Sequence, residues 1–335
     1  MSTVEKISDL IARKEKITLG GGKDKLEKQK QSGSMTARER IEALLDEGSF
    51  VEIGAFISAR DEETAADGVI TGYGSVDSRL VYVYSQDVTV LGGAMGEMYA
   101  NKINKIVDMA AKMGAPVIGM LDSNGVRLSD GPRVQRAMGR VLSSFANISG
   151  VVPHISIVFG NCAGGSAIAA AMSDFVVMNA KTGKMFVTGP DIIEASEGVA
   201  PSVDAKGSVN KNGNAHLIGE DDLGCIEITK LLLSYIPSNN LSDAFIYETA
   251  DDLNRPCDIL DDIENISDDE IGLELWEDYN CVCLVRDGML GFFTNNGKYI
   301  EPAYLNYTVD PCGGDIHVET LDGYGVLRYP KYILE

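Results

Sequence analysis

Two short glycine-bearing segments have residue types and spacing that could carry chemistry: residues 122–127 read DSNGVR and residues 160–166 read GNCAGGS. Each follows an apolar run, 115–121 and 154–159, that predicts a buried strand. A strand that ends in glycine and turns into a helix leaves backbone N–H groups without partners, pointing to one place. Two such corners on neighbouring strands would form an oxyanion hole, which stabilises an enolate or a tetrahedral intermediate. The predicted chemistry is therefore that of a carbonyl or thioester group, performed largely by main-chain donors.

Alternating strands and helices must position these corners. The pattern predicts strands at Gly68–Gly74, Leu80–Ser85, Val117–Leu121, Ile155–Phe159, Phe175–Asn179 and Met185–Thr188. It predicts helices at Gly93–Met113, Arg133–Ile148, Gly165–Met172, Pro190–Glu197 and Asp222–Leu233. Repeated strand–strand–helix units with apolar strands are typical of a layered α/β domain.

The ends of the chain differ from this middle part. Residues 4–19 form an amphipathic helical pattern that stops at three glycines, and Thr36 with Glu39 fits a capping box that opens a helix through Leu45. Residues 241–280 carry fourteen acidic residues and one base, which is typical of a linker. Strand-like pieces follow at Cys281–Val285 and Met289–Thr294.

Composition excludes several classes of function. The net charge of −21 argues against nucleic-acid binding, although residues 1–40 hold ten Lys/Arg against six Asp/Glu. That basic arm either receives a phosphorylated ligand or is one solvated helix face. No apolar run is long enough to span a bilayer, and the N-terminus lacks the apolar middle of a signal peptide. Six scattered cysteines and three histidines argue against zinc, so free thiols in the cytoplasm are expected.

A family resemblance extends in register over residues 18–250. The chain resembles biotin-dependent acyl-CoA carboxyltransferases, including propionyl-CoA carboxylase β subunits and the α subunits of sodium-pumping acyl-CoA decarboxylases. The matching segments are Leu19–Gly22, Thr36–Ile41, Leu44–Phe50, Asp67–Val69, Ser85–Gly93, Gly114–Ile118, Gly160–Gly165, Ser173–Phe175, Phe186–Asp191 and Gly213–His216.

This resemblance implies a crotonase (ClpP/crotonase-like) α/β fold, a spiral of ββα units with extra N-terminal helices. The expected divisions are a helical arm at 1–48, the carboxyltransferase domain at 49–250, and an acidic linker with the truncated start of a second domain at 251–335. Members of the family pair a domain that takes coenzyme A with a second domain, in a neighbouring subunit, that takes biotin. The second half of the site is therefore expected from a partner chain in a homo- or hetero-oligomer.

The resemblance also implies a mechanism without an enzyme nucleophile. Carboxybiotin on a separate carrier protein releases CO₂, and the enolate of the acyl-CoA thioester is held by backbone donors. The residues implied for this catalytic role are Gly125, Val126, Gly164 and Gly165. The residues implied for substrate binding are Gly92, Gly93, Ala163, Thr188, Gly189 and His216. No biotinylation site or ATP-binding segment is found, so both are expected on other chains.

Departures from the family pattern leave alternatives open. The first corner usually reads DSGGAR, so Asn124 and the β-branched Val126 are unusual, and Val126 would crowd an approaching thioester. A non-catalytic acyl-CoA-binding or scaffold subunit is the main alternative. An isolated crotonase-type hydratase, isomerase or decarboxylase is a third, and Ser166 with His216 would suit a hydrolase.

Single residues leave smaller questions open. Arg127 could pair with Asp122 or anchor its loop, and Cys162 could be reactive or simply small and buried. Glu97 could be a general base or a helix cap. The helix Gly93–Met113 has apolar residues enough for either the core or a subunit interface.

Overall fold

The computed structural model describes a large N-terminal part and short strands in a C-terminal part. The described residues are 3–58, 65–199, 201–210, 212–243, 274–276, 281–286, 289–294, 299–309, 316–320 and 323–327. The chain divides into two units, Met1–Tyr247 and Glu248–Glu335. Most of the predicted acidic linker, residues 244–273 and 277–280, lies outside the described residues.

Three helices open the first unit: α1 Thr3–Thr18, α2 Lys23–Gln31 and α3 Ala37–Leu44. Neither α1 nor α2 has a buried residue. The predicted capping box is confirmed, because Thr36 accepts from the Glu39 N–H while Glu39 accepts from the Thr36 N–H. Helix α3 buries one face against the body of the unit, so it alone of these three has a core side.

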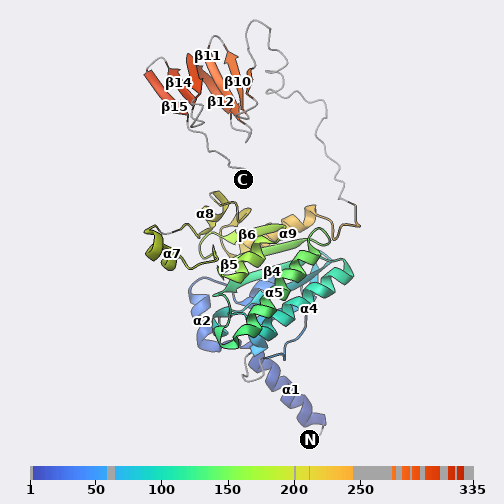
Figure 1. Ribbon diagram of the computed structural model, residues 1–335. Helices are drawn as coiled ribbons and strands as arrows, with labels where there is room; N and C mark the ends of the chain where they lie inside the picture. Colours follow the sequence, from blue (N-terminus) through green and yellow to red (C-terminus); the bar gives the residue numbers. More distant parts are fainter. Residues whose placement is uncertain are drawn as a thin grey trace. The chain divides into compact units, whose positions relative to one another are not determined.

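A mixed sheet forms the centre of this unit (Figure 1). Its strands are β1 Val51–Glu52, β2 Val69–Val76, β3 Arg79–Gln86, β4 Val117–Ser123, β5 His154–Ala163, β6 Phe175–Asn179, β7 Lys184–Phe186 and β8 Leu217–Gly219. The order is β1-β2-β3-β4-β5-β6-β8, with β7 also paired to β5. The β1–β2 and β2–β3 pairs are antiparallel and the others parallel, so the ends of β4 and β5 meet at one edge.

Helices cover both faces of the sheet, which confirms the layered α/β prediction. Helices α4 Glu97–Met113 and α5 Pro132–Ile148 pack on one face, and α3 with α9 Asp222–Tyr235 packs on the other. The remaining helices are α6 Gly165–Ala171, α7 Pro190–Glu197, α8 Ala205–Asn210 and the 3₁₀ turns η1 Ala65–Gly68, η2 Leu91–Gly93 and η3 Leu128–Asp130.

Helix α4 begins at Glu97, four residues later than the predicted start at Gly93. Gly92 and Gly93 both have positive φ, +67° and +66°, and therefore cannot start an α-helix. The apolar residues of α4 lie in the core of this unit: Ile103, Ile106, Val107 and Ala110 are buried there. This face of α4 therefore packs in the core and does not form a subunit interface.

The described residues of the second unit form two small antiparallel sheets. The first has the order β12-β11-β10-β9 and the second β13-β14-β15. Their strands are β9 Glu274–Trp276, β10 Cys281–Arg286, β11 Met289–Thr294, β12 Tyr299–Tyr304, β13 Asn306–Val309, β14 Ile316–Thr320 and β15 Gly323–Leu327. The strands predicted at 281–285 and 289–294 are β10 and β11.

Candidate active site

The two glycine-bearing segments lie side by side, as the sequence predicts. Ser123 at the end of β4 pairs with Cys162 on β5. The Asn161 Nδ2 atom donates to Asn124 Oδ1 at 2.8 Å. We call residues 123–127 the first corner and residues 163–166 the second corner.

The first corner presents one unused N–H group. Gly125, with φ +108°, donates its N–H to Ser123 Oγ at 3.1 Å, and its carbonyl accepts from the Met95 N–H at 2.8 Å. The Arg127 N–H donates to the Met95 carbonyl at 2.8 Å. Since successive N–H groups of an extended segment alternate in direction, the Val126 N–H points away from Met95. Within the described residues the Val126 N–H has no acceptor, whereas the Gly125 N–H already donates to Ser123 Oγ.

The Val126 side chain does not crowd this site. It is half-buried and packs against the core cluster beneath α4 and α5. The β-branched group is thus in contact with the core, while the Val126 N–H remains unused.

The second corner corrects one of the expected donors. The Gly164 N–H donates to the Phe186 carbonyl at 2.9 Å, so it is unavailable to a substrate; Gly164 instead supplies the turn, with φ +61°. The next two N–H groups, of Gly165 and Ser166, begin α6 and have no acceptor among the described residues. The second corner therefore offers Gly165 and Ser166 rather than Gly164 and Gly165.

The carbonyl groups of Gly92 and Gly93 hold the first corner through hydrogen bonds. The Gly92 carbonyl accepts from the Asn124 N–H at 3.1 Å, and the Gly93 carbonyl accepts from Ser123 Oγ at 2.7 Å. A Cβ on Gly93 would run into the Asp122 carbonyl, so this close approach requires glycine. The structure brings both glycines to the site, where they contact the corner.

The other predicted binding residues divide into two groups. Ala163 belongs to the second corner and pairs with Phe186 on β7, whose chain continues into Thr188 and Gly189. His216 lies elsewhere. Its N–H donates to the Val176 carbonyl and its Nδ1 accepts from the Val176 N–H, both at 2.9 Å.

His216 is therefore not part of the corner cluster. Val176 pairs with Ser156, near the start of β5, whereas the second corner follows the end of that strand. The imidazole of His216 instead caps the start of β6, and substrate binding by His216 stays a prediction. The same placement separates it from Ser166, so no Ser–His pair forms.

Arg127 anchors the first corner to a neighbouring turn and not to Asp122. Its Nη1 lies 2.9 Å from Asp67 Oδ1, and both side chains are buried. Asp67 also accepts from the Tyr99 N–H at 2.8 Å. The turn that holds Asp67 is itself tied to Lys102, whose Nζ donates to the carbonyls of Ala66, at 2.7 Å, and Val69.

Because of Lys102, the free energy of unfolding should rise measurably as the pH becomes alkaline. Burial lowers the pKa of Lys102 to about 8 in the folded state, from an ordinary value of 10.5. Between these values the unfolded chain holds a proton that the folded chain has released, so the free energy of unfolding rises with pH. From pH 7.5 to 10, the Lys102→Met variant should gain roughly 2–3 kcal/mol less than the wild type in urea unfolding. Equal pH dependence of the two proteins would contradict this.

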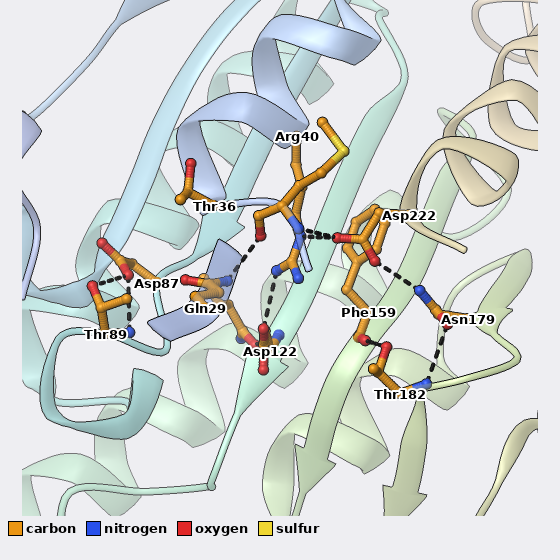
Figure 2. A network of polar contacts seen from close by, with 12 residues as sticks. Gln29, Thr36, Arg40, Asp87, Thr89, Asp122, Phe159, Asn179, Thr182 and Asp222 are labelled. Carbon is orange, nitrogen blue, oxygen red and sulfur yellow. Dashed lines mark hydrogen bonds and ion pairs between the residues drawn. The ribbon is translucent and has the colours of Figure 1, made fainter. Parts of the chain in front are cut away.

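A buried ion triad lies directly before the first corner (Figure 2). Arg40 of α3 is 1% exposed, and its Nη1 and Nε lie 3.1 Å from Asp122 Oδ2 and Asp222 Oδ2 respectively. Burial raises the pKa of Asp122, and the neighbouring Arg40 opposes that rise. The triad is not among the features predicted from the sequence. The available signal was that Arg40 occupies a core position in the pattern Ala37, Arg40, Ile41, Leu44.

Three residues near the corners are candidates for a chemical role from the sequence: Cys162, Ser166 and Glu97. Cys162 is fully buried, and burial raises the pKa of its thiol to about 12, so it is not a reactive cysteine. Ser166 is 2% exposed and its Oγ has no partner in the described residues. Glu97 lies in the first turn of α4, where its own N–H donates to Asp130 Oδ2 at 3.0 Å.

The basic arm lines a cavity of about 270 Å³ between α2 and α3. Lys23, Lys30 and Arg38 lie on its wall. Lys30 pairs with Glu39 at 2.5 Å and Arg38 with Glu52 at 2.8 Å, so protein carboxylates already meet two of these cations. Binding of a phosphorylated ligand there stays a prediction.

Two kinds of site are absent from the part of the chain that the structure describes. It holds no group of three or more His, Cys, Asp or Glu side chains arranged to bind a metal ion. None of its helices combines the length and the apolar character needed to cross a membrane.

Comparison with known proteins supplies the family context. The model of the carboxyl transferase domain matches residues 28–269. The chain is 44% identical over 261 residues to the methylmalonyl-CoA decarboxylase subunit alpha of Propionigenium modestum, a match that covers 75% of this chain and 50% of that protein. It is 40% identical over 261 residues to the propionyl-CoA carboxylase beta chain of Saccharopolyspora erythraea, covering 75% and 48%. This chain spans about half the length of the curated relatives it matches.

A solved structure agrees with these matches. Transcarboxylase 12S, a hexamer assembly with methylmalonyl-CoA and methylmalonic acid bound, superposes with a TM-score of 0.74 at 32% identity. The superposition covers 89% of this chain and 62% of that one. A single-chain long-chain acyl-CoA carboxylase also matches, with a TM-score of 0.63 at 25% identity, over 87% of this chain and 32% of that one. The crotonase-type α/β fold implied by the sequence is confirmed.

Proposed function

Because this chain belongs to the carboxyl transferase family, we propose that it is the acyl-CoA-binding part of a biotin-dependent carboxyltransferase. The reaction moves a carboxyl group between biotin and an acyl-CoA, as a carboxylase or as a decarboxylase. The proposed partners are a biotin carrier protein and a carboxyltransferase domain on the biotin side, in a cytoplasmic oligomer. The hexamer of transcarboxylase 12S supports the oligomer.

The observation that carries the proposal is the set of unused N–H groups at two adjacent corners. Val126 at the first corner and Gly165 and Ser166 at the second have N–H groups without acceptors in the described residues. An enolate forms when a thioester loses its α-carboxyl group or its α-proton, and its negative charge develops on the thioester oxygen. Donors already held in place stabilise that charge without reorganising, and one such donor typically lowers the barrier by about 3–4 kcal/mol.

The residues at the corners fit a thioester because their unused donors are main-chain N–H groups. Gly165 packs closely against Met138 of α5, where an added Cβ would lie 2.6 Å from Cε, and the half-buried Val126 side chain packs against the core. Carboxybiotin, when bound, supplies or accepts the carboxyl group. The part played by this chain is to hold the thioester oxygen and to position the α-carbon.

Two of the features that favoured a non-catalytic scaffold, Asn124 and Val126, are accommodated by the structure. Asn124 accepts a hydrogen bond from Asn161, and Val126 packs into the core while its N–H remains unused. Neither departure from the usual motif removes a donor, so the catalytic proposal is preferred.

Acyl-CoA binding by the purified chain tests the proposal. We expect calorimetric titration with acetyl-, propionyl- and methylmalonyl-CoA to give micromolar affinity for at least one thioester. Gly165→Val should weaken that affinity at least tenfold, because its Cβ would collide with Met138 Cε at 2.6 Å and displace the backbone that carries the donors of the second corner.

A matched control separates the site from the helix that carries it. Ala171→Val introduces the same side chain at the exposed far end of α6, and its affinity should stay within about twofold of the wild type. Absence of binding for every thioester, or equal losses in both variants with folding intact, would contradict the proposal.

A further inference from the structure

The strand ladder that should hold the first corner is interrupted immediately before it. Leu121 pairs with Val158 and Ser123 pairs with Cys162, so the register between β4 and β5 shifts at Asp122. Three residues of β5, 159–161, lie opposite this single residue. Such a bulge re-aims the backbone and removes ladder hydrogen bonds at that point. The corner that follows therefore needs support from outside this pair of strands.

Side chains supply that support around Asp122. Its N–H donates to Gln86 Oε1 of β3 at 2.9 Å, and its Oδ2 receives Arg40 Nη1 at 3.1 Å. On the other side its carboxylate lies over Gly160, where the absence of a Cβ leaves just enough room. Asp122 is thereby held between β3, β5 and α3 at the place where the ladder is broken.

Arg40 extends the same support to α9, which lies on the same face of the sheet as α3. Its guanidinium lies 4.3 Å from the centre of the Phe159 ring, within the bulge, and its Nε reaches Asp222 on α9 (Figure 2). Asp222 in turn accepts from Asn179 Nδ2 at 2.7 Å. The Asn179 Oδ1 atom accepts from the Lys181 N–H at 2.8 Å, in the loop that leads to β7.

These contacts link both corners to one buried cation. The first corner follows Asp122 directly. The second corner is held by β7, because the Gly164 N–H donates to the Phe186 carbonyl. Nothing in the triad touches the unused N–H groups themselves, so its action on them is through the backbone.

We infer that Arg40 is a positioning residue, which fixes the first corner by holding Asp122 where the β4–β5 ladder is interrupted. This inference rests on the proposed function only for its catalytic consequence. Its structural consequence is that residues 123–127 open locally when the Arg40–Asp122 contact is lost, while the rest of the sheet stays closed.

Amide hydrogen exchange on the full chain, followed by mass spectrometry, tests the structural consequence. In Asp122→Asn, which keeps the side-chain volume and the Arg40–Asp222 pair, exchange within 123–127 should rise at least tenfold. Exchange within Val81–Tyr84 of β3 should change less than about twofold, because segments can open locally while core strands stay closed. Arg40→Met should show the same pattern with a larger rise in exchange within residues 123–127. If Arg40→Met does not fold, the result for Asp122→Asn decides whether the inference holds.

The control variant is Arg38→Met, on the same helix. Arg38 pairs with Glu52 and contacts neither Asp122 nor Asp222, so exchange at the corner should not change. An unchanged corner in folded Asp122→Asn, or an equal rise in the corner and in β3, would overturn the inference.

Carboxyl transfer with the partner domain and carrier present tests the catalytic consequence. In Asp122→Asn, kcat should fall at least tenfold while KM changes less than about threefold, because a small displacement of a donor acts mainly on the transition state. If the wild type neither transfers a carboxyl group nor binds thioesters, the proposed function fails, and the exchange experiment still decides the role of Arg40.

Discussion

Gly160→Ala should lower the free energy of unfolding by about 3–5 kcal/mol, the range found when a buried ion pair loses one partner. An added Cβ would lie 2.7 Å from Asp122 Cγ and still closer to its Oδ1. The carboxylate cannot move aside freely, because Arg40 and the register shift fix it from the other side. The substitution therefore either displaces Asp122 from Arg40 or distorts β5.

Urea unfolding at neutral pH measures this effect. Gly139→Ala is the control, since Gly139 lies on the exposed side of α5 and its added Cβ would meet nothing within 4 Å. That control should be neutral or stabilising by up to about 1 kcal/mol, from helix propensity alone. A loss below about 1 kcal/mol in Gly160→Ala would show that Asp122 is not held as described.

Gly93→Ala should destabilise the protein by about 3 kcal/mol or more. Two effects add: alanine at φ +66° costs about 1–2 kcal/mol, and the new Cβ would collide with the Asp122 carbonyl and lie 3.2 Å from Ser123 Cα. Both of these neighbours are backbone atoms of the strand that ends in the first corner, so neither can rotate away.

Gly92→Ala separates the two effects. Gly92 has nearly the same φ, +67°, but its added Cβ would meet only the side-chain amide of Asn124, at 2.8 Å. Because that amide can rotate, the expected loss is about 1–2 kcal/mol, from backbone strain alone. Thermal or urea unfolding of the two variants, side by side, should give a difference of at least about 1 kcal/mol. Equal losses would mean that the contact with the strand is unimportant.

Local sequence patterns were sufficient to predict the layers of the fold and the position of the corners. Strands such as β6, Phe175–Asn179, and helices such as α7, Pro190–Glu197, were predicted to the residue, because apolar periodicity and turn residues act over short distances. The glycines of the corners could be found for the same reason, since each follows the strand that it terminates.

The choice of donors and partners could not be predicted, because it depends on segments distant in the sequence. The Gly164 N–H is used by Phe186, and Arg127 pairs with Asp67, sixty residues before it. Arg40 gathers Asp122 and Asp222 from 82 and 182 residues away. The motif predicts that His216 binds substrate, and its position directly before β8 places it against the start of β6.

The same separation sets the order in which the site can form during synthesis. Arg40 leaves the ribosome long before Asp222. During that interval the Arg40 guanidinium on α3 lacks its second carboxylate partner, because Asp222 has not yet been synthesised. Contacts between distant segments are entropically expensive and tend to form late. Helix α9 is thus the segment whose arrival closes the triad, and the corner at residues 123–127 reaches its final geometry only after a part of the chain nearly one hundred residues further on has docked.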